Sequence, residues 1–480
     1  MTARRLAVVL VAAVAAAAAC SAPLPASALD PHELAGRITV DNMFVHLRKL
    51  QDIADSHDGN RAVGNPGYDA SVDYVAQVLR DKGFDVQTPE FERMGTMRGG
   101  HPALTVSGRT YQVDQASMLV TTSPEGVNAP TLRPPTSSGC AAEDYGTLNI
   151  SGAIAVVDDT RCSVVVKQNT ALAKGAVGML VVDTGGQPPP GGLFSTGYYR
   201  QLTVPVGIID ETADAALRRT SAPVRLVLDG RAEMVKHRNV TAQTKTGSTS
   251  DVVLAGAHLD SVGGGAGIND NGSGVAALLE TALQLGSSPN TRNAVRFAFW
   301  GAEELGLDGS TQYVRGLPLD QLDDLALYLN FDMVGSPNAG FFTYDGDQSG
   351  QATDPKPMPE GSAAIERTMA GYLNLAGIRP ADMPIGPNTD YHPFLQAGVP
   401  VGGVTTGSSQ RKTEVQARLW GGRAGVAFDP NYHTGRDTID NVDARALGIM
   451  GPAIAFTVGT YAASIEGPNG VPARDKRHRG

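Results

Sequence analysis

Acidic and histidine side chains recur in this 480-residue sequence directly after runs that predict β-strands. His258 and Asp260 follow the run "DVVLAGA", and Asp270 stands just before the helix-forming run "GVAALLETALQL". Glu303 and Glu304 follow a second apolar run, "AVRFAFWG". Because ligands of open α/β sheets bind at the carboxyl ends of the strands, we expect these side chains to lie together at one edge of a sheet.

Three further residues extend this set. Asp332 follows the run "LALYLNF", and Tyr432 and His433 lie in the late loop "DPNYHTGRDT". Imidazole and carboxylate suit zinc, and one zinc ion takes about three protein ligands plus water. Five candidate ligands therefore indicate two zinc ions per chain, with Asp270 between them, and such ions lie roughly 3.5–4 Å apart. An aspartate or histidine at one such position is more often a helix cap, a turn former or a hydrogen-bonded scaffold residue. The prediction therefore rests on the repeated occurrence of these residues at predicted strand ends.

The elements that must position these residues alternate between strand and helix from about residue 237 to the run "GIMGPAIAFTVGTYAASIE". This alternation predicts an α/β fold with a mixed, mostly parallel sheet sandwiched by helices. Residues 38–92 predict a helix, a loop, a helix and a strand, "DVQTPEFE". From about 105 to 234 short β-rich runs separated by Pro and Gly turns predict a small inserted domain.

Five segments carry a resemblance to a known family. In order, they are "AGAHLDSV", "GINDNGSG", "WGAEELGLDGS", "NFDMVG" and "YHTGRDTIDNV". They closely resemble the co-catalytic di-zinc aminopeptidases of the bacterial leucine aminopeptidase type. The resemblance implies a zinc exopeptidase fold and an enzyme that hydrolyses the amino-terminal residue from peptides with free amino termini.

The same resemblance implies the ligands of each zinc ion. Carried over position by position, His258 and Asp332 would bind one ion, Glu304 and His433 would bind the other, and Asp270 would bridge both. The family therefore implies two co-catalytic zinc ions in each chain.

The remaining roles also follow from the family. Glu303 would be the general base, and Tyr432 would donate a hydrogen bond to the developing oxyanion. Asp260 would orient the imidazole of His258 as a partner outside the ligand set. The segment "NTDYHPFLQAGVP" is similar to a late loop of the family, and we assign its Asp390 and His392 only a structural role.

The inserted block resembles a protease-associated (PA) domain. "SGAIAVVDDTRCSVVVKQNTALAKGAVGMLVVD" has that domain's strand, Cys-containing loop, Lys-bearing helix and Gly-Ala before a second strand. It departs from the pattern at "DDTRCSVVV", where a Gly-Cys-aromatic stretch is common. The predicted division is a signal peptide (1–20), a linker (21–37), a zinc peptidase domain (38–104 and 235–466), the PA domain (105–234) and a basic tail (467–480).

Residues 1–20 predict export. Two arginines precede an apolar run that is too short to span a bilayer, which is typical of a secretion signal. The run ends at Cys20 and resembles a bacterial lipobox, so we predict a cell-envelope lipoprotein that meets the membrane only through its lipid. Cleavage after Ala28 would instead give a secreted enzyme. We expect that no later segment is long and apolar enough to cross a membrane.

Two cysteines, Cys140 and Cys162, remain after processing. In an oxidising compartment we predict that they form a disulfide, with two buried free thiols as the alternative.

The net charge of −10 at pH 7 does not indicate binding to nucleic acid, which is itself negatively charged. The basic end, "ARDKRHRG", is expected to be a solvated tail.

Other functions compete with the aminopeptidase. A carboxypeptidase of the same superfamily would share the ligands but hold a substrate carboxylate with basic residues. A glutaminyl cyclase would use one zinc ion, which the full set of His258 and Asp332 disfavours. A catalytically inactive binding protein built on the same two domains is disfavoured because every ligand position is filled. The sequence does not indicate the preferred side chain, the natural substrate, the oligomeric state or the role of the PA domain.

Overall fold

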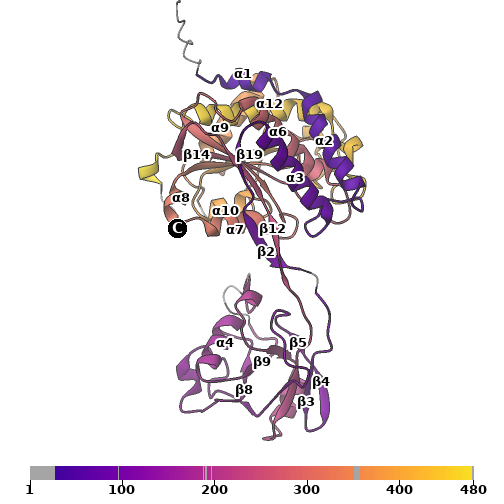
Figure 1. Ribbon diagram of the computed structural model, residues 1–480, viewed down its shortest axis with the longest axis vertical. Helices are drawn as coiled ribbons and strands as arrows, with labels where there is room; N and C mark the ends of the chain where they lie inside the picture. The colour runs from indigo at the N-terminus through magenta and orange to yellow at the C-terminus, as the bar shows by residue number, and fades with distance from the viewer. Residues whose placement is uncertain are drawn as a thin grey trace, which may run out of the picture.

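The computed structural model describes residues 28–477 apart from residues 96, 188, 190, 191, 196 and 351–356. The predicted signal segment with Cys20 therefore lies outside the described residues. Figure 1 shows a larger α/β body joined by a narrow ribbon to a smaller β-rich body. The smaller body is an insertion, because the larger one contains both the first and the last described elements.

The larger body is built on an eight-stranded mixed sheet with the order β1-β13-β15-β14-β16-β19-β17-β18. Its centre is parallel and consists of β15 (Asn293–Trp300), β14 (Ser248–His258), β16 (Leu325–Phe331) and β19 (Val401–Thr405). Apart from the first four residues of β14, these strands are almost wholly buried, as expected for strands covered on both faces. The mixed, mostly parallel sheet predicted from the sequence is confirmed. The outer strands are β1 (Asp85–Gln87), β13 (Val240–Gln243), β17 (Phe342–Tyr344) and β18 (Ala381–Met383).

Helices cover both faces of this sheet, and each face has its own apolar cluster. The larger cluster includes the first helix of the chain, α1 (Pro31–Gly36), which packs on the last long helix. One face carries α2 (Val40–Asp55), α3 (Pro66–Asp81), α6 (Gly274–Leu285), α9 (Ser362–Leu375) and α12 (Ala444–Ala463), and the other carries α7 (Asp308–Gly316), α8 (Leu319–Asp323) and α10 (Tyr391–Gln396).

Capping residues explain where several helices begin. The hydroxyl of Thr39 accepts the N–H of Asn42 at 3.3 Å before α2. The side chain of Asn65 accepts the N–H of Gly67 at 2.7 Å, and Pro66 then occupies the first turn of α3. These pairings satisfy backbone donors that have no partner inside the helix. Local sequence therefore sets where α2 and α3 begin.

The helix α12 is long and apolar enough to cross a membrane by length and composition. This finding corrects our expectation that no segment after the signal passes that test. However, 67% of its apolar window is buried, and it packs against α1, α6 and α9. Its burial identifies α12 as a core helix of the larger body.

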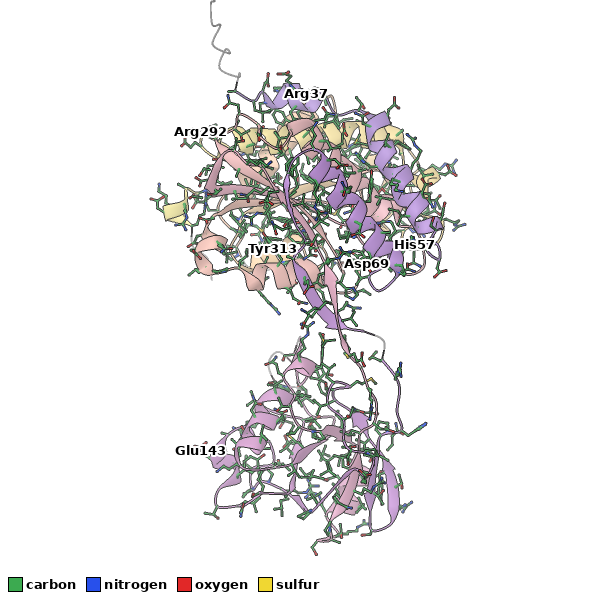
Figure 2. All side chains as sticks on the ribbon, viewed as in Figure 1. Arg37, His57, Asp69, Glu143, Arg292 and Tyr313 are labelled. Carbon is green, nitrogen blue, oxygen red and sulfur yellow. A yellow bond between two sulfur atoms is a disulfide. The ribbon has the colours of Figure 1, made fainter. Side chains whose placement is uncertain are left out.

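The ribbon between the bodies consists of β2 (Glu90–Met94) and β12 (Met234–Arg238), which pair antiparallel. The sequence predicts a single strand over "DVQTPEFE", and this is wrong. The chain pairs with β13 as β1, is interrupted at Pro89, which has no N–H to donate, and then leaves the sheet as β2. Arg238 forms an ion pair with Asp69 at 3.4 Å, and Figure 2 shows Asp69 where the ribbon leaves the larger body.

The smaller body contains two sheets, with strand orders β5-β10-β9-β8-β7 and β4-β3-β11-β6. The predicted runs "AIAVVDD", "VGMLVVD" and "VRLVLDG" form β8, β9 and β11. The limits at 105 and 234 stay a prediction. The elements are β3 (Ala103–Val106), β4 (Arg109–Gln112), β5 (Asp114–Gln115), β6 (Val127–Ala129), β7 (Thr131–Leu132), β8 (Ile154–Asp158), α4 (Val164–Ala173), β9 (Gly178–Val182), β10 (Val206–Ile209), α5 (Glu211–Leu217) and β11 (Val224–Val227).

A disulfide joins Cys140 and Cys162, which are 22 residues apart. The ammonium group of the buried Lys167 donates to the carbonyl of Ser138 at 2.7 Å and to that of Thr160 at 2.6 Å. Lys167 thus links the loop that contains Cys140 to the loop that contains Cys162, in addition to the disulfide. A disulfide that closes a loop of this size contributes roughly 3 kcal/mol in the chain-entropy account.

The end of the described chain is folded against the larger body. Arg477 is 7% exposed, and its guanidinium donates to the carbonyls of Ser250 at 2.9 Å and Asp323 at 2.7 Å and to the carboxylate of Asp251. The expectation of a fully solvated tail is therefore wrong at Arg477, because its donors are satisfied by the body. Residues 478–480 lie beyond the described part.

Candidate active site

The candidate residues come from three neighbouring parallel strands. His258 is the last residue of β14, Asp332 directly follows β16, and Glu303 and Glu304 follow β15 closely. The order β15-β14-β16 places these three strand ends side by side. The loops therefore leave the same edge of the sheet, where the sequence predicts the chemistry.

The backbone is left-handed at non-glycine residues beside the candidate side chains of these loops and at His433 in the late loop. Ala302 has φ 56°, Met333 has φ 52° and His433 has φ 58°. Each is a candidate site residue or directly adjoins one. L-residues rarely adopt this conformation, and such strained positions cluster at functional sites.

Two imidazoles face the same carboxylate from different sides. The Nε2 atom of His258 lies 3.2 Å from Oδ1 of Asp270 and 3.3 Å from Oδ1 of Asp332. The Nε2 atom of His433 lies 3.2 Å from Oδ2 of Asp270 and 2.9 Å from Oε2 of Glu304. Each carboxylate oxygen of Asp270 thus faces a different histidine: Oδ1 faces His258 and Oδ2 faces His433.

Asp260 contacts His258 in a way that the sequence does not predict. The Nδ1 atom of His258 lies 3.1 Å from the backbone carbonyl oxygen of Asp260 and 3.6 Å from its carboxylate Oδ1. The carboxylate Oδ1 accepts the N–H of Glu303 at 3.2 Å. The backbone carbonyl of Asp260 therefore lies nearer to the imidazole than its carboxylate does, and the carboxylate instead binds the backbone at the start of the Glu303–Glu304 pair.

The five candidate ligands, Glu303 and Tyr432 line a cavity of about 420 Å³. The ring of Tyr432 stacks on that of His433 with centroids 3.7 Å apart. The lining combines the imidazoles and carboxylates with polar and apolar side chains. The first set is His258, Asp270, Glu303, Glu304, Asp332 and His433, and the apolar and aromatic residues include Met333, Tyr344, Met383, Pro384 and Tyr391.

The packing of acids and imidazoles shifts their proton affinities. Burial raises the pKa of Glu303 well above its usual range and raises the pKa of Glu304 to about 7. Hydrogen bonds to the carboxylates of Asp270 and Glu304 raise the pKa of His433 to about 10. The carboxylates therefore create a negative environment that favours bound cations.

Unsatisfied oxygens show that the site fits a metal ion. Oε1 of Glu304 and Oδ1 of Asp332 are buried and have no hydrogen-bond partner, which is costly for a carboxylate. His258 offers a ligand atom within 4.8 Å of atoms from Glu303 and Asp332, and likewise of atoms from Asp270 and Glu304. Imidazole nitrogens together with free carboxylate oxygens are the donor set that zinc prefers.

The loop "NTDYHP" lies against this centre. The hydroxyl of Thr389 donates to Oδ2 of Asp332 at 2.9 Å, which leaves Oδ1 as the open oxygen. Asp390 is buried and accepts the hydroxyl of Ser310 at 2.5 Å. Thr389 could not be predicted from the sequence, because a hydroxyl that binds a carboxylate from another loop has no recognisable spacing.

Two buried charged residues next to the site were also missed. Arg61 donates to carbonyls of the segment that follows His258, and Asp437 accepts the N–H groups of Asn269 and Asp270. Burial lowers the pKa of Arg61 to about 10, so it keeps its charge at neutral pH. Arg61 lies in the predicted loop "GNRAVGNPGYD" and Asp437 in the segment "YHTGRDTIDNV", but contacts to backbone atoms give no sequence signal.

Comparison with known proteins adds independent findings. The sequence profile of peptidase family M28 matches residues 239–458, and that of the PA domain matches residues 127–217. The chain is 48% identical to the probable lipoprotein aminopeptidase LpqL of Mycobacterium tuberculosis, over 95% of this chain and 91% of the relative. It is 37% identical to an aminopeptidase of Pseudomonas aeruginosa, over 93% of this chain and 85% of the relative.

Two solved structures share the fold. An aminopeptidase from Aneurinibacillus sp. strain AM-1 superposes with a TM-score of 0.52 at 22% identity, covering 91% of this chain and 96% of that chain. A zinc aminopeptidase from Bacillus subtilis, BSAP, also gives a TM-score of 0.52, at 23% identity, covering 90% and 97%. Both comparisons support the arrangement of a peptidase fold across most of the chain.

The fold and the histidine–carboxylate centre define a metallopeptidase with an inserted PA domain. The chain belongs to peptidase family M28, and it is an aminopeptidase of that family. The family, the inserted PA domain and the enzyme class predicted from the sequence are confirmed.

Proposed function

We propose that this chain is an exported aminopeptidase that binds two zinc ions at its active site. The observation that carries the proposal is the division of Asp270, whose two oxygens face the Nε2 atoms of two different histidines. One ion would take His258 and Asp332, the other Glu304 and His433, and Asp270 would serve both.

Glu303 is the proposed general base. Bound zinc would lower the pKa of a water molecule and polarise the carbonyl of the peptide bond. Glu303 takes the proton of the attacking water and passes it to the departing nitrogen, as the new C–O bond forms and the C–N bond breaks. Because burial raises the pKa of Glu303, this carboxylate is suited to hold that proton between the two steps.

Tyr432 is the proposed donor to the oxygen that gains negative charge. It lines the cavity beside His433, and burial raises its pKa, so that the phenol remains protonated. A donor placed where charge develops stabilises the transition state more than the ground state. Tyr432 would therefore contribute to turnover more than to substrate binding.

The charge of the cavity supports selection of a free amino terminus. No lysine or arginine occurs among the described residues that line it, so a substrate carboxylate finds no cationic side chain there. This disfavours the carboxypeptidase. Glu303 and Asp332 instead offer acids to a substrate amine, whereas an acylated nitrogen has lost the basicity that acids recognise. An inactive binding protein is disfavoured because Glu303 and all five candidate ligands line the cavity.

Export through a lipid anchor is the proposed localisation. The Mycobacterium tuberculosis relative is named a lipoprotein, and Cys20 of this chain ends a predicted signal. We expect the wild-type protein in the membrane fraction and the Cys20→Ser variant outside it. Wild-type protein found only in the soluble fraction would instead favour cleavage after Ala28.

A single peptide experiment tests the specificity. The enzyme is given a peptide with a free amino terminus and the same peptide acetylated there, and mass spectrometry follows the products. We expect a ladder that loses residues from the amino end of the free peptide and very slow turnover of the acetylated one. Equal cleavage of both peptides, or a ladder from the carboxyl end, would contradict the proposal.

A further inference from the structure

A glycine-rich segment separates two of the proposed ligands. Residues 259–267 run from His258 at the end of β14 to the irregular helical turn η3 (Ile268–Ser273), which contains Asp270. Four of these nine residues are glycines, which impose little conformational preference. Contacts from elsewhere in the chain must therefore fix where Asp270 lies relative to His258.

Arg61 makes the first of these contacts from the loop between α2 and α3. Its side chain is fully buried. Its Nε donates to the carbonyl of Ala266 at 2.9 Å, its Nη2 to that of Gly267 at 2.7 Å, and its Nη1 to that of Leu259. A single rigid guanidinium thus joins the two ends of the glycine-rich segment.

Asp437 makes the second set of contacts from the loop after His433. Its Oδ1 accepts the N–H of Asn269 at 2.8 Å, and its Oδ2 accepts the N–H of Asp270 at 2.9 Å. Its backbone carbonyl also accepts the N–H of Ile268, at 3.2 Å. The side chain is 2% exposed, so water does not substitute for these bonds.

The two residues act on complementary backbone groups. Arg61 binds carbonyls at positions 266 and 267, and Asp437 binds N–H groups at positions 268, 269 and 270. Hydrogen bonds to charged groups are worth more than those to neutral groups, and losing one inside a protein leaves a buried backbone group unpaired. The side chains of Arg61 and Asp437 therefore hold residues 266, 267, 269 and 270, and the backbone carbonyl of Asp437 holds residue 268. Neither Arg61 nor Asp437 lines the cavity.

We propose that Arg61 and Asp437 are positioning residues that hold the backbone of residues 266–270 and thereby place the carboxylate of Asp270 between the two zinc ions. This inference rests on the proposed function. Because Asp270 would serve both ions, its displacement weakens both. Replacement of partners outside the ligand set typically costs about 10–100-fold in metal affinity or activity.

Two substitutions with matched controls test the proposal. Asp437→Asn keeps the shape but turns an amide N–H toward a backbone N–H, and Arg61→Lys keeps the charge but loses the planar fork. The controls make similar changes outside the cavity lining. They are Asp345→Asn, whose carboxylate also accepts two backbone N–H groups, from Ser349 and Gly350, and Arg477→Lys, which is also buried and donates to backbone carbonyls.

Zinc affinity is measured by competition with a chelator, and the visible spectrum of the cobalt-substituted protein reports the ligand geometry. We expect the two test variants to bind zinc about 10–100-fold more weakly, to show altered cobalt absorption, and to lose kcat while KM changes little. Both controls should keep the wild-type zinc affinity and spectrum, even where their melting temperature falls.

Several outcomes would overturn the inference. The first is that the Asp437→Asn variant binds zinc as tightly as the wild type and shows the same cobalt absorption, whatever its stability. Another is an equal loss in the controls, because that would indicate general destabilisation. If Arg61→Lys does not fold, Asp437→Asn decides alone. A wild-type protein that binds no zinc would contradict the proposed function itself, and with it the basis of this inference.

Discussion

Among the described residues of the larger body, acidic side chains lie close enough to hold a cation at two places, which differ in the hydrogen bonds that the carboxylates already accept. One is the centre around Asp270. The other, which we name the acidic turn, consists of Asp345, Asp347 and Glu366. In the acidic turn the carboxylates are occupied by backbone donors: Asp345 accepts the N–H groups of Ser349 and Gly350 at 3.0 and 2.9 Å, and Glu366 accepts those of Gly346 and Asp347 at 2.8 and 3.1 Å.

The centre around Asp270 lacks such donors at its open oxygens. Glu304 Oε1 and Asp332 Oδ1 are buried without a hydrogen-bond partner, and two imidazoles lie beside them. Closeness of acids is therefore not enough to indicate a zinc site. Unsatisfied buried oxygens together with imidazole nitrogens distinguish the proposed zinc centre from acids that stabilise a turn.

The largest expected effect concerns Glu303, which should act on the reaction and not on the metal. Glu303→Gln should lower kcat by a factor of about 10²–10⁴, the usual worth of general acid–base catalysis, with zinc content unchanged. Steady-state kinetics and elemental analysis on the same preparation measure both. Activity close to that of the wild type would remove Glu303 from its proposed role.

The second prediction contrasts one acid from each group. Glu304→Gln should lose zinc, because it removes a proposed ligand, whereas Glu366→Gln in the acidic turn should keep the wild-type zinc content. Elemental analysis after dialysis compares the two variants. Equal zinc loss, or equal retention, would break the distinction that we draw between the two groups.

The smallest expected effect is a pH dependence of stability at Glu366. Burial raises the pKa of Glu366 to about 7, so the folded state binds this proton more tightly than the unfolded state. The free energy of unfolding therefore falls as pH rises from the unfolded pKa of about 4.3 toward 7. Glu366→Gln should remove roughly 1–2 kcal/mol of that fall. Parallel pH curves of melting temperature for variant and wild type would contradict this.

Much of the fold could be predicted because hydrophobic periodicity reports burial. The run "GVAALLETALQL" forms α6, and the apolar runs before His258, Glu303 and Asp332 form the central strands. The single strand predicted over "DVQTPEFE" is wrong because its first half pairs with β13 and its second half pairs with β12. Strand pairing between distant segments leaves no local pattern.

The candidate site, like the fold, could be predicted from the sequence only in part. Ligand-type side chains at strand ends are visible in the sequence, and the structure brings His258, Asp270, Glu304, Asp332 and His433 into one cavity. Their roles stay a prediction. Residues that act on backbone atoms could not be found, since Arg61 and Asp437 meet the loop only after folding. Asp260 shows the limit most clearly, because its carbonyl and not its carboxylate lies nearer to His258.

The metal content of the wild-type protein tests the central claim most directly. Elemental analysis of the purified enzyme is combined with hydrolysis of an aminoacyl amide before and after chelation. The account predicts two zinc ions per chain, loss of hydrolysis when they are removed, and recovery when zinc is returned. Full hydrolysis by metal-free protein, or saturation at one ion per chain, would contradict it.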